Sequence, residues 1–294
     1  MPPLQPSSLP VMASAAPPHV SALLADLVDD AAVFPPGLAP LDVAVDQHLR
    51  LRSHPYAACI GPLLVPVTAA GELATLAAKD DRAVAEPLEV ALVLRPDSPM
   101  EPLLDAVELL RDEPRARVTG VEVGWNPNWR QAIALGLPIV VEVRLGDEQR
   151  DGLDEIATAV DEGAPVIAKF RTGPTPAWPW PDEETLAGFL AGAIERGLPF
   201  KLTGGLHHAV RGEYKDRPMH GVVNAMLATH EGLDGADGGE LAKVLRQTRA
   251  EPLVERLGAL DPSQVDRLRS SFTSYACCGV LEPLDELAAL GLVR

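Results

Sequence analysis

Two apolar runs decide the fold: Ile139-Val140-Val141-Glu142-Val143 and Val166-Ile167-Ala168-Lys169-Phe170, with a helix-compatible segment at 152–162 between them. Continuous apolar runs of this length are typical of strands that are buried on both faces of a parallel sheet. The alternation extends outward, with runs at 60–67, 90–94, 118–123, 200–203, 221–225 and 272–277 and helix-compatible segments at 41–53, 71–79, 102–111, 183–196 and 238–260. Eight units in about 230 residues predict an α/β fold, a closed (β/α)8 barrel of the TIM type.

The rest of the chain suggests one domain behind a short leader. Residues 1–18 hold six prolines, which predicts a flexible proline-rich leader. Residues 19–294 predict a single barrel domain, and its first part reads as helical because Leu23, Leu24, Leu27 and Val28 fall on one helical face. Neither a G-x-G-x-x-G dinucleotide motif nor a phosphate-binding loop occurs, so we expect no cofactor.

The charge and the cysteine content indicate which classes of binding partner and which localisation to expect. The sequence has 25 Lys and Arg against 42 Asp and Glu, a net charge of −17. That charge repels phosphate backbones and anionic membranes, so we expect a small-molecule ligand and neither nucleic acid nor membrane. Three cysteines and an N-terminus without a basic, apolar signal sequence predict a cytoplasmic protein. Barrels often associate, so a homo-oligomer is possible.

Four predicted strands carry a charge within an apolar run. The charged residues are Glu122, Glu142, Lys169 and Lys201, each near the C-terminal end of its strand. In a TIM-type barrel that end is the catalytic mouth. A buried ion pair gains little stability over packed apolar residues, because desolvation offsets the attraction. We therefore favour a catalytic cluster, while an ion-pair lattice that holds the strands in register stays open as the alternative.

The two lysines point to one kind of chemistry. An amine is nucleophilic only after it loses its proton, and burial or a second cation nearby lowers a lysine pKa. Neighbouring parallel strands lie roughly 4.8 Å apart, so Lys169 and Lys201 would share one pocket if both point inward. One amine could then form an iminium with a carbonyl compound, and Glu122 or Glu142 could move the protons.

The local sequence also resembles a known family. The segments Ala168-Lys169-Phe170-Arg171-Thr172-Gly173 and Phe200-Lys201-Leu202-Thr203-Gly204-Gly205 resemble the K-x-x-T-G and K-x-x-G-G strands of deoxyribose-phosphate aldolase and related class I aldolases. The resemblance covers residues 117–205. It implies that Lys169 is the Schiff-base lysine and Lys201 the cation that lowers its pKa. It also implies that the motif residues Thr172, Gly204 and Gly205 contact the substrate.

Further binding candidates follow the two lysine strands. Arg171 and Arg211 could bind an anionic group, because a guanidinium matches carboxylate or phosphate. His207 and His208 come directly after the Lys201 strand, where turn residues can reach the mouth, and Asn224 lies in the next candidate strand. We assign these three residues to substrate binding as well.

Three functions stay open at this point. The leading one is a class I aldolase-like lyase that acts on a small anionic carbonyl compound. The second is a metal-dependent barrel lyase or hydrolase with ligands from His207, His208, His220 and Glu142. The third is a non-catalytic ligand-binding barrel, which predicts that the lysines and glutamates pair off completely.

Overall fold

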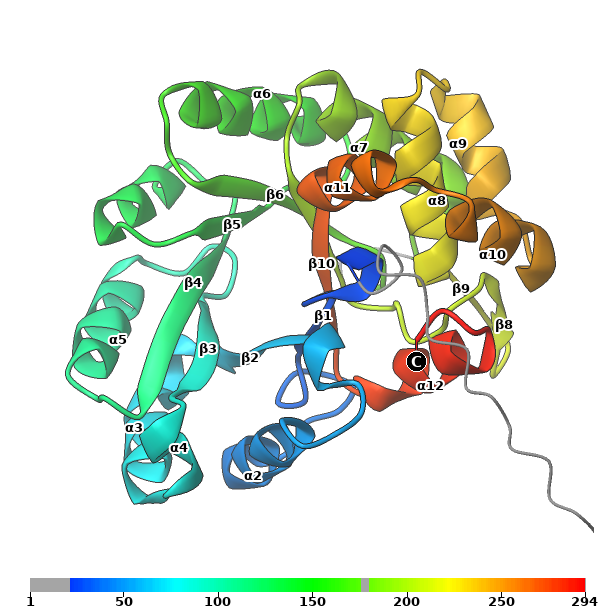
Figure 1. The fold of residues 1–294 in the computed structure, drawn as a ribbon. Coiled ribbons are helices and arrows are strands. Elements are labelled where there is room, and N and C mark those ends of the chain that lie inside the picture. The colour runs from blue at the N-terminus through cyan, green and yellow to red at the C-terminus, as the bar shows by residue number, and fades with distance from the viewer. Residues whose placement is uncertain (1–21, 176–179, 294) are drawn as a thin grey trace, which may run out of the picture.

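A closed barrel of eight parallel strands forms the centre of the molecule (Figure 1). The computed structural model describes residues 22–175 and 180–293. The strand order is β1-β10-β7-β6-β5-β4-β3-β2. The strands are β1 (Val28–Asp30), β2 (Ile60–Pro66), β3 (Leu88–Val93), β4 (Ala116–Gly124), β5 (Ile139–Glu142), β6 (Val166–Arg171), β7 (Phe200–Thr203) and β10 (Phe272–Cys277). The predicted (β/α)8 barrel is confirmed, and the predicted leader at 1–18 lies outside the described residues.

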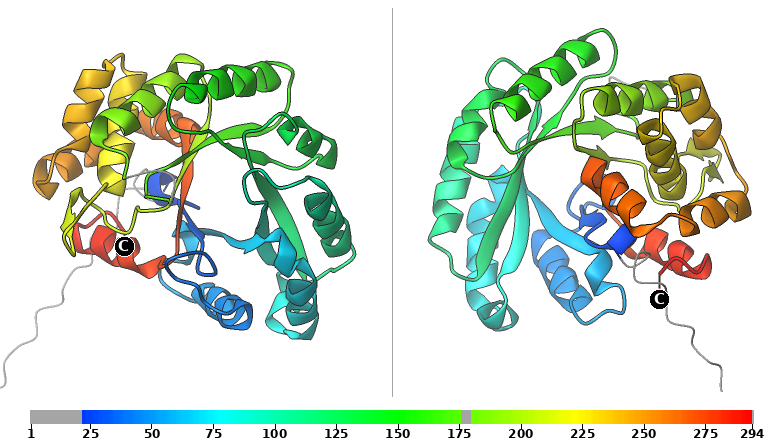
Figure 2. Two further views of the ribbon diagram at one scale, coloured as in Figure 1. Left: turned by 180° about the vertical axis from the view of Figure 1, so that it is seen from behind. Right: turned by 45° about the horizontal axis from the view of Figure 1, so that its top comes forward.

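Helices surround the barrel, as both views in Figure 2 show. They are α2 (Leu41–Leu51), α3 (Ala70–Lys79), α4 (Arg82–Ala85), α5 (Glu101–Arg111), α6 (Glu148–Asp161), α7 (Glu183–Glu195), α8 (Val222–Leu233), α9 (Gly238–Leu245), α10 (Ala250–Gly258), α11 (Pro262–Ser271) and α12 (Leu281–Ala289). Asp182, Asp237 and Asp261 cap α7, α9 and α11 by accepting a backbone N–H in the first turn. In the described ranges, no helix combines the length and apolarity that a bilayer crossing requires.

The strand predictions were wrong at two places. Residues 221–225 begin α8, whose residues from Val222 to His230 are all buried. An apolar run inside a fully buried helix looks like a buried strand, because neither has a polar face. The true first strand is β1, which lies within the segment read as helical and contains Asp29 and Asp30.

The chain makes a long excursion between β7 and β10. It forms the small antiparallel hairpin of β8 (Gly212–Tyr214) and β9 (Arg217–Met219), and then the four helices α8 to α11. These helices form the thick yellow-to-orange part of the outer layer in Figure 1. The excursion places the polypeptide after β7 next to the end of β10 and the start of α12.

The two faces of the barrel strands have opposite chemistry. On the outer face, a continuous aromatic row joins the strands to α7. Its ring centroids are 4.7 Å apart for Phe170 and Phe189, 5.6 Å for Phe189 and Phe200, and 5.4 Å for Phe200 and Phe272. On the inner face, β6 and β7 carry the charged side chains of Lys169 and Lys201. Apolar side chains on or directly after β1, β2, β3 and β10 form a separate buried cluster: Ala31, Leu64, Ala91 and Ala276.

Candidate active site

The barrel brings the four predicted charges together. Glu142 is the register partner of Lys169, and Lys169 is the register partner of Lys201. Register partners on parallel strands point to the same face of the sheet. Glu122, on β4, reaches Lys169 from two strands away and Lys201 from three. The sequence therefore predicted correctly that these four side chains converge inside the barrel.

The carboxylate of Glu122 bridges the two lysines. Its Oε2 lies 2.6 Å from Lys169 Nζ, and its Oε1 lies 2.5 Å from Lys201 Nζ. Glu142 Oε2 accepts a second bond from Lys169 at 2.9 Å. Lys169 and Lys201 are 4% and 3% exposed, so these contacts are shielded from water. Lys169 is thus ion-paired with two carboxylates and shares one of them with Lys201.

Two further residues extend the cluster at its ends. Arg171 Nε donates to Glu142 Oε1 at 3.0 Å, and Lys201 donates to Asp29 on β1. Asp29 also accepts from Ser274 Oγ at 3.1 Å. The result is a chain of alternating charge in the order Arg171, Glu142, Lys169, Glu122, Lys201, Asp29, which we call the charge chain. It has three cations and three anions, so its net charge is zero.

Contacts between carboxylates and ammonium groups, more than burial, determine the pKa values of Glu122, Lys169 and Lys201 in the charge chain. Burial alone would raise the pKa of Glu122, but the ammonium groups of Lys169 and Lys201 outweigh it and lower that pKa to about 2. Burial alone would lower the pKa of Lys169, but Glu122 and Glu142 outweigh it and raise that pKa. Asp29 and Glu122 raise the pKa of Lys201 in the same way. The predicted lowering of the Lys169 pKa by Lys201 is therefore wrong for this state, because three carboxylates surround the two amines.

Asp29 is the member of the charge chain that the sequence analysis missed. It lies in a strand of only three residues, and the apolar residues before it match a helical face. Burial raises the pKa of Asp29, although Lys201 acts against that shift. A signal was present in the sequence, because Asp29, like the four predicted charges, interrupts an apolar run.

The Thr-Gly and Gly-Gly pairs after β6 and β7 hold the two strand ends together. Thr172 is fully buried, and its hydroxyl donates to the carbonyls of Thr203 and Gly204 at 3.2 and 3.1 Å. A Cβ at Gly173 would collide with the Gly204 carbonyl, so the loops approach each other more closely than any larger residue allows. Gly204 and Gly205 have φ values of +67° and +124°. These contacts give the motif residues a positioning role, and contact with a substrate stays a prediction.

Each of the three candidate histidines has a different hydrogen-bond partner. His207 Nδ1 lies 2.8 Å from Glu282, and His208 Nδ1 lies 2.7 Å from Glu286. His220 Nε2 donates to the Pro181 carbonyl at 2.9 Å. Among the described residues, no three His, Cys, Asp or Glu side chains are grouped as metal ligands. The predicted metal set of His207, His208, His220 and Glu142 is therefore wrong.

Arg211 and Asn224 have structural partners. Arg211 forms an ion pair with Glu183 on α7 and donates to the Gly212 carbonyl at 3.0 Å. Asn224 is fully buried on α8, accepts from the Arg211 N–H at 2.8 Å and donates to the Gln247 carbonyl at 2.7 Å. The Asn224 amide therefore ties the α8 start to the loop after α9, and substrate binding by Asn224 and Arg211 stays a prediction.

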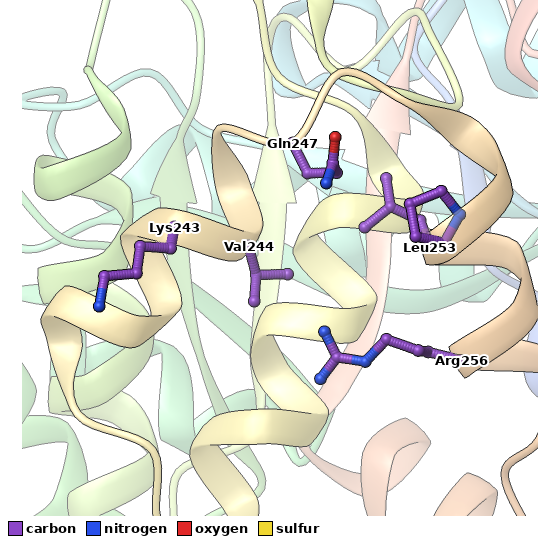
Figure 3. A pocket seen from close by; sticks show the side chains of 6 residues that line it. Lys243, Val244, Gln247, Leu253 and Arg256 are labelled. Carbon is purple, nitrogen blue, oxygen red and sulfur yellow. The ribbon is translucent and has the colours of Figure 1, made fainter.

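Two cavities of the described residues lie away from the charge chain. The first, of about 170 Å³, lies between α9 and α10, and Figure 3 shows Lys243, Val244 and Arg256 among its lining residues. The second, of about 110 Å³, lies beside the hairpin and includes Trp180 and His220. Neither cavity is lined by Lys169 or Lys201.

Comparison with known proteins returns aldolases. The structure of a protein named QR15, an aldolase, is 12% identical, with a TM-score of 0.49 over 92% of this chain and 98% of that chain. An archaeal fructose-1,6-bisphosphate aldolase, with its catalytic lysine bound to the carbinolamine intermediate of its substrate, is 14% identical, with a TM-score of 0.39 over 94% of this chain and 99% of that chain. No protein-family model and no curated protein matches the sequence. Similarity at this level carries no argument about activity, which therefore rests on the residues of the site.

Proposed function

We propose that this protein is an aldolase-type lyase that acts on a small anionic carbonyl compound through a lysine Schiff base. The proposal is carried by one observation: Lys169 and Lys201 stand in register on neighbouring strands and share the Glu122 carboxylate. Stability alone gives little reason to bury such a set, because the desolvation of each ion offsets the attraction between them. A carboxylate between two amines is, in contrast, well placed to move a proton.

The Schiff base requires a proton to leave Lys169. Transfer from Lys169 to Glu122 gives a neutral amine and a neutral carboxylic acid, while Asp29 keeps the Lys201 charge paired. The amine adds to the carbonyl carbon, and Glu122 returns the proton to the hydroxyl of the adduct, which leaves as water. The resulting iminium withdraws electrons from the adjacent carbon–carbon bond, which breaks. Glu142, the second partner of Lys169, is the candidate for the proton that moves in that step.

The first transfer is uphill in the free protein. The pKa of Glu122 is lowered and that of Lys169 is raised, so the proton stays on the amine. A bound substrate must therefore make a carboxylate beside Lys169 a better proton acceptor. Arg171 offers a route, because an anionic substrate group that binds Arg171 competes with its partner Glu142, whose pKa Arg171 otherwise helps to lower. Arg211 has no such link to Lys169, so we assign the anion to Arg171.

Reduction with borohydride tests the covalent step. The full chain is incubated at pH 7 with acetaldehyde, pyruvate or dihydroxyacetone phosphate and then reduced, which converts an iminium into a stable secondary amine. Peptide mass mapping locates the label. We expect at least one probe to label Lys169, Lys169→Met to abolish this label, and Lys201→Met to reduce it.

The exposed lysines Lys79, Lys215 and Lys243 serve as internal controls, because any amine reacts slowly with an aldehyde. Lys243→Met is the matched variant and leaves the label on Lys169 unchanged. A label confined to the three exposed lysines overturns the proposal.

A second candidate function is a ligand-binding barrel without chemistry. The favouring observation is that Lys169 and Lys201 each have two carboxylate partners. Complete pairing is what an ion-pair lattice predicts. The observed arrangement differs from a lattice of separate ion pairs in one respect, because the two lysines share the Glu122 carboxylate. The reduction experiment separates the two functions, since a lattice gives no label on either buried lysine.

A further inference from the structure

A cluster of thiol, imidazole and carboxylate groups lies at the ends of β7 and β10. Cys278 directly follows β10, and His207 lies four residues after the end of β7. Cys278 Sγ lies 3.7 Å from His207 Nε2, and Glu282 Oε2 lies 2.8 Å from His207 Nδ1. Glu282 belongs to the first turn of α12. The imidazole therefore stands between a thiol and a carboxylate, each on its own ring nitrogen.

This order of groups has a direct chemical consequence. The Glu282 carboxylate accepts the Nδ1–H bond, which leaves Nε2 as the nitrogen that faces Cys278. Nε2 can take the thiol proton, and the imidazolium formed is stabilised by Glu282 on one side and by the thiolate on the other. The sulfurs of Cys277 and Cys278, and Glu282 after them, raise the pKa of His207 well above its ordinary value. The neighbouring acid on α12, Glu286, is bound by His208 and by the Ala209 N–H.

The three cysteines differ in their surroundings. Cys278 is partly exposed, whereas Cys277 and Cys59 are buried. Cys277 Sγ lies 3.6 Å from His207 Nδ1, but that nitrogen is bound by Glu282, and the thiol donates to the Gly279 carbonyl at 3.4 Å. Burial, and Asp26 after it, raise the pKa of Cys59. Only Cys278 combines solvent access with a free ring nitrogen of His207.

We propose that Cys278 is a reactive thiolate, activated by His207 and positioned by Glu282, and that it is a site of covalent modification by peroxides and other soft electrophiles. In the peroxide reaction, a bond forms between Sγ and one oxygen while the oxygen–oxygen bond breaks. The leaving hydroxide takes the proton from His207 Nε2 and departs as water. The sulfur is oxidised by two electrons to a sulfenic acid and the peroxide is reduced. This site does not depend on the lysine chemistry proposed above.

Alkylation rates test the activation. The native full chain is treated with iodoacetamide between pH 6 and 8, and the modification of each cysteine is followed by peptide mass spectrometry. An ordinary thiol, with a pKa near 8.5, loses roughly a hundredfold in rate from pH 8 to pH 6, whereas a thiolate paired with imidazolium loses less than about tenfold. We expect the second behaviour for Cys278 only. The chain unfolded in guanidinium chloride provides the ordinary reference.

Three variants locate the cause. His207→Gln is expected to lower the Cys278 rate at pH 6 by about tenfold or more, and Glu282→Gln by a smaller factor. Glu282 is mostly exposed, so its variant tests the relay without a risk to folding. His208→Gln is the matched control and leaves the rate unchanged. A Cys278 rate with the same pH dependence in the folded and unfolded chain overturns the proposal, as does a rate that His207→Gln does not change.

The peroxide arm uses hydrogen peroxide and dimedone, which traps sulfenic acids. We expect the adduct on Cys278 and its loss in Cys278→Ser. An adduct that forms equally on Cys59 and Cys278 would show that no site is activated.

Discussion

Strands β6 and β7 contribute to the barrel through apolar contacts on their outer face and ion pairs on their inner face. Of their outward residues, Phe170 stacks on Phe189 of α7 and Phe200 meets the same ring edge to face. Their inward residues Lys169 and Lys201 depend on carboxylates from other strands. Apolar packing accepts another apolar shape at a modest cost, whereas a buried charge without its partner has no substitute. Apolar packing on the outer face therefore accounts for the stability of the barrel. The buried charges on the inner face are not accounted for by stability and point to a function.

Removal of Glu122 is the most severe test of this comparison. Glu122→Ala leaves both ammonium groups buried with one carboxylate fewer, so we expect the free energy of unfolding to fall by about 3 to 5 kcal/mol. Urea unfolding at pH 7 measures it. A loss below about 1 kcal/mol would mean that water reaches the charge chain, and the contrast between the two faces would disappear.

The pH dependence tests the same residue without breaking its shape. The pKa of Glu122 is lowered from 4.5 to about 2, so its charged form stabilises the fold above pH 4.5 and this contribution is lost as the pH falls toward 2. The difference in unfolding free energy between wild type and Glu122→Gln should shrink by roughly 3 kcal/mol from pH 5 to pH 2. Asp29, whose raised pKa acts in the opposite direction, is present in both proteins. A difference that is constant over this range contradicts the ion pairing.

Much of this architecture could be predicted from the sequence. Strands such as β5 and β6 consist mainly of apolar residues, and a buried parallel strand has few other sequence patterns. The charges at Glu122, Glu142, Lys169 and Lys201 were detectable because each interrupts such a run. Asp29 interrupts an apolar run in the same way, but β1 was not predicted as a strand because it has only three residues, two of them aspartates. Residues 221–225 were predicted as a strand because they begin α8, which is buried on every side and so lacks the polar face that marks a surface helix.

The electrostatics of the site could not be predicted in the same way. The alternation of strands shows that two lysines share a face, but not how many carboxylates reach them. Glu122 reaches Lys201 across the barrel interior, and Asp29 comes from the opposite end of the sequence. A pKa depends on the sum of such contacts, and the pKa of Lys169 is raised because both Glu122 and Glu142 contact its amine directly, which strand alternation alone does not show.

The outer face should tolerate a change of shape. Phe189→Leu removes the ring contacts with Phe170 and Phe200 but keeps an apolar side chain, so we expect a loss of about 1 to 2 kcal/mol in the free energy of unfolding. The label on Lys169 in the borohydride experiment should not change. Urea unfolding and the same peptide map measure the two quantities, and a loss as large as that of Glu122→Ala would show that the two faces do not differ.

Arg171 gives the smallest effect on stability and the sharpest one on function. Its side chain is 36% exposed, so water screens its pair with Glu142, and Arg171→Met should lower the unfolding free energy by less than about 1 kcal/mol. Its effect on labelling should depend on the probe. The concentration of dihydroxyacetone phosphate that gives half-maximal label on Lys169 should rise at least about tenfold, because the phosphate loses a charge-assisted partner. The corresponding concentration of acetaldehyde, which carries no charge, should stay unchanged. An equal shift for both probes would assign Arg171 to the support of Glu142 alone, and the solvent-facing end of the charge chain would then not be where the anion binds.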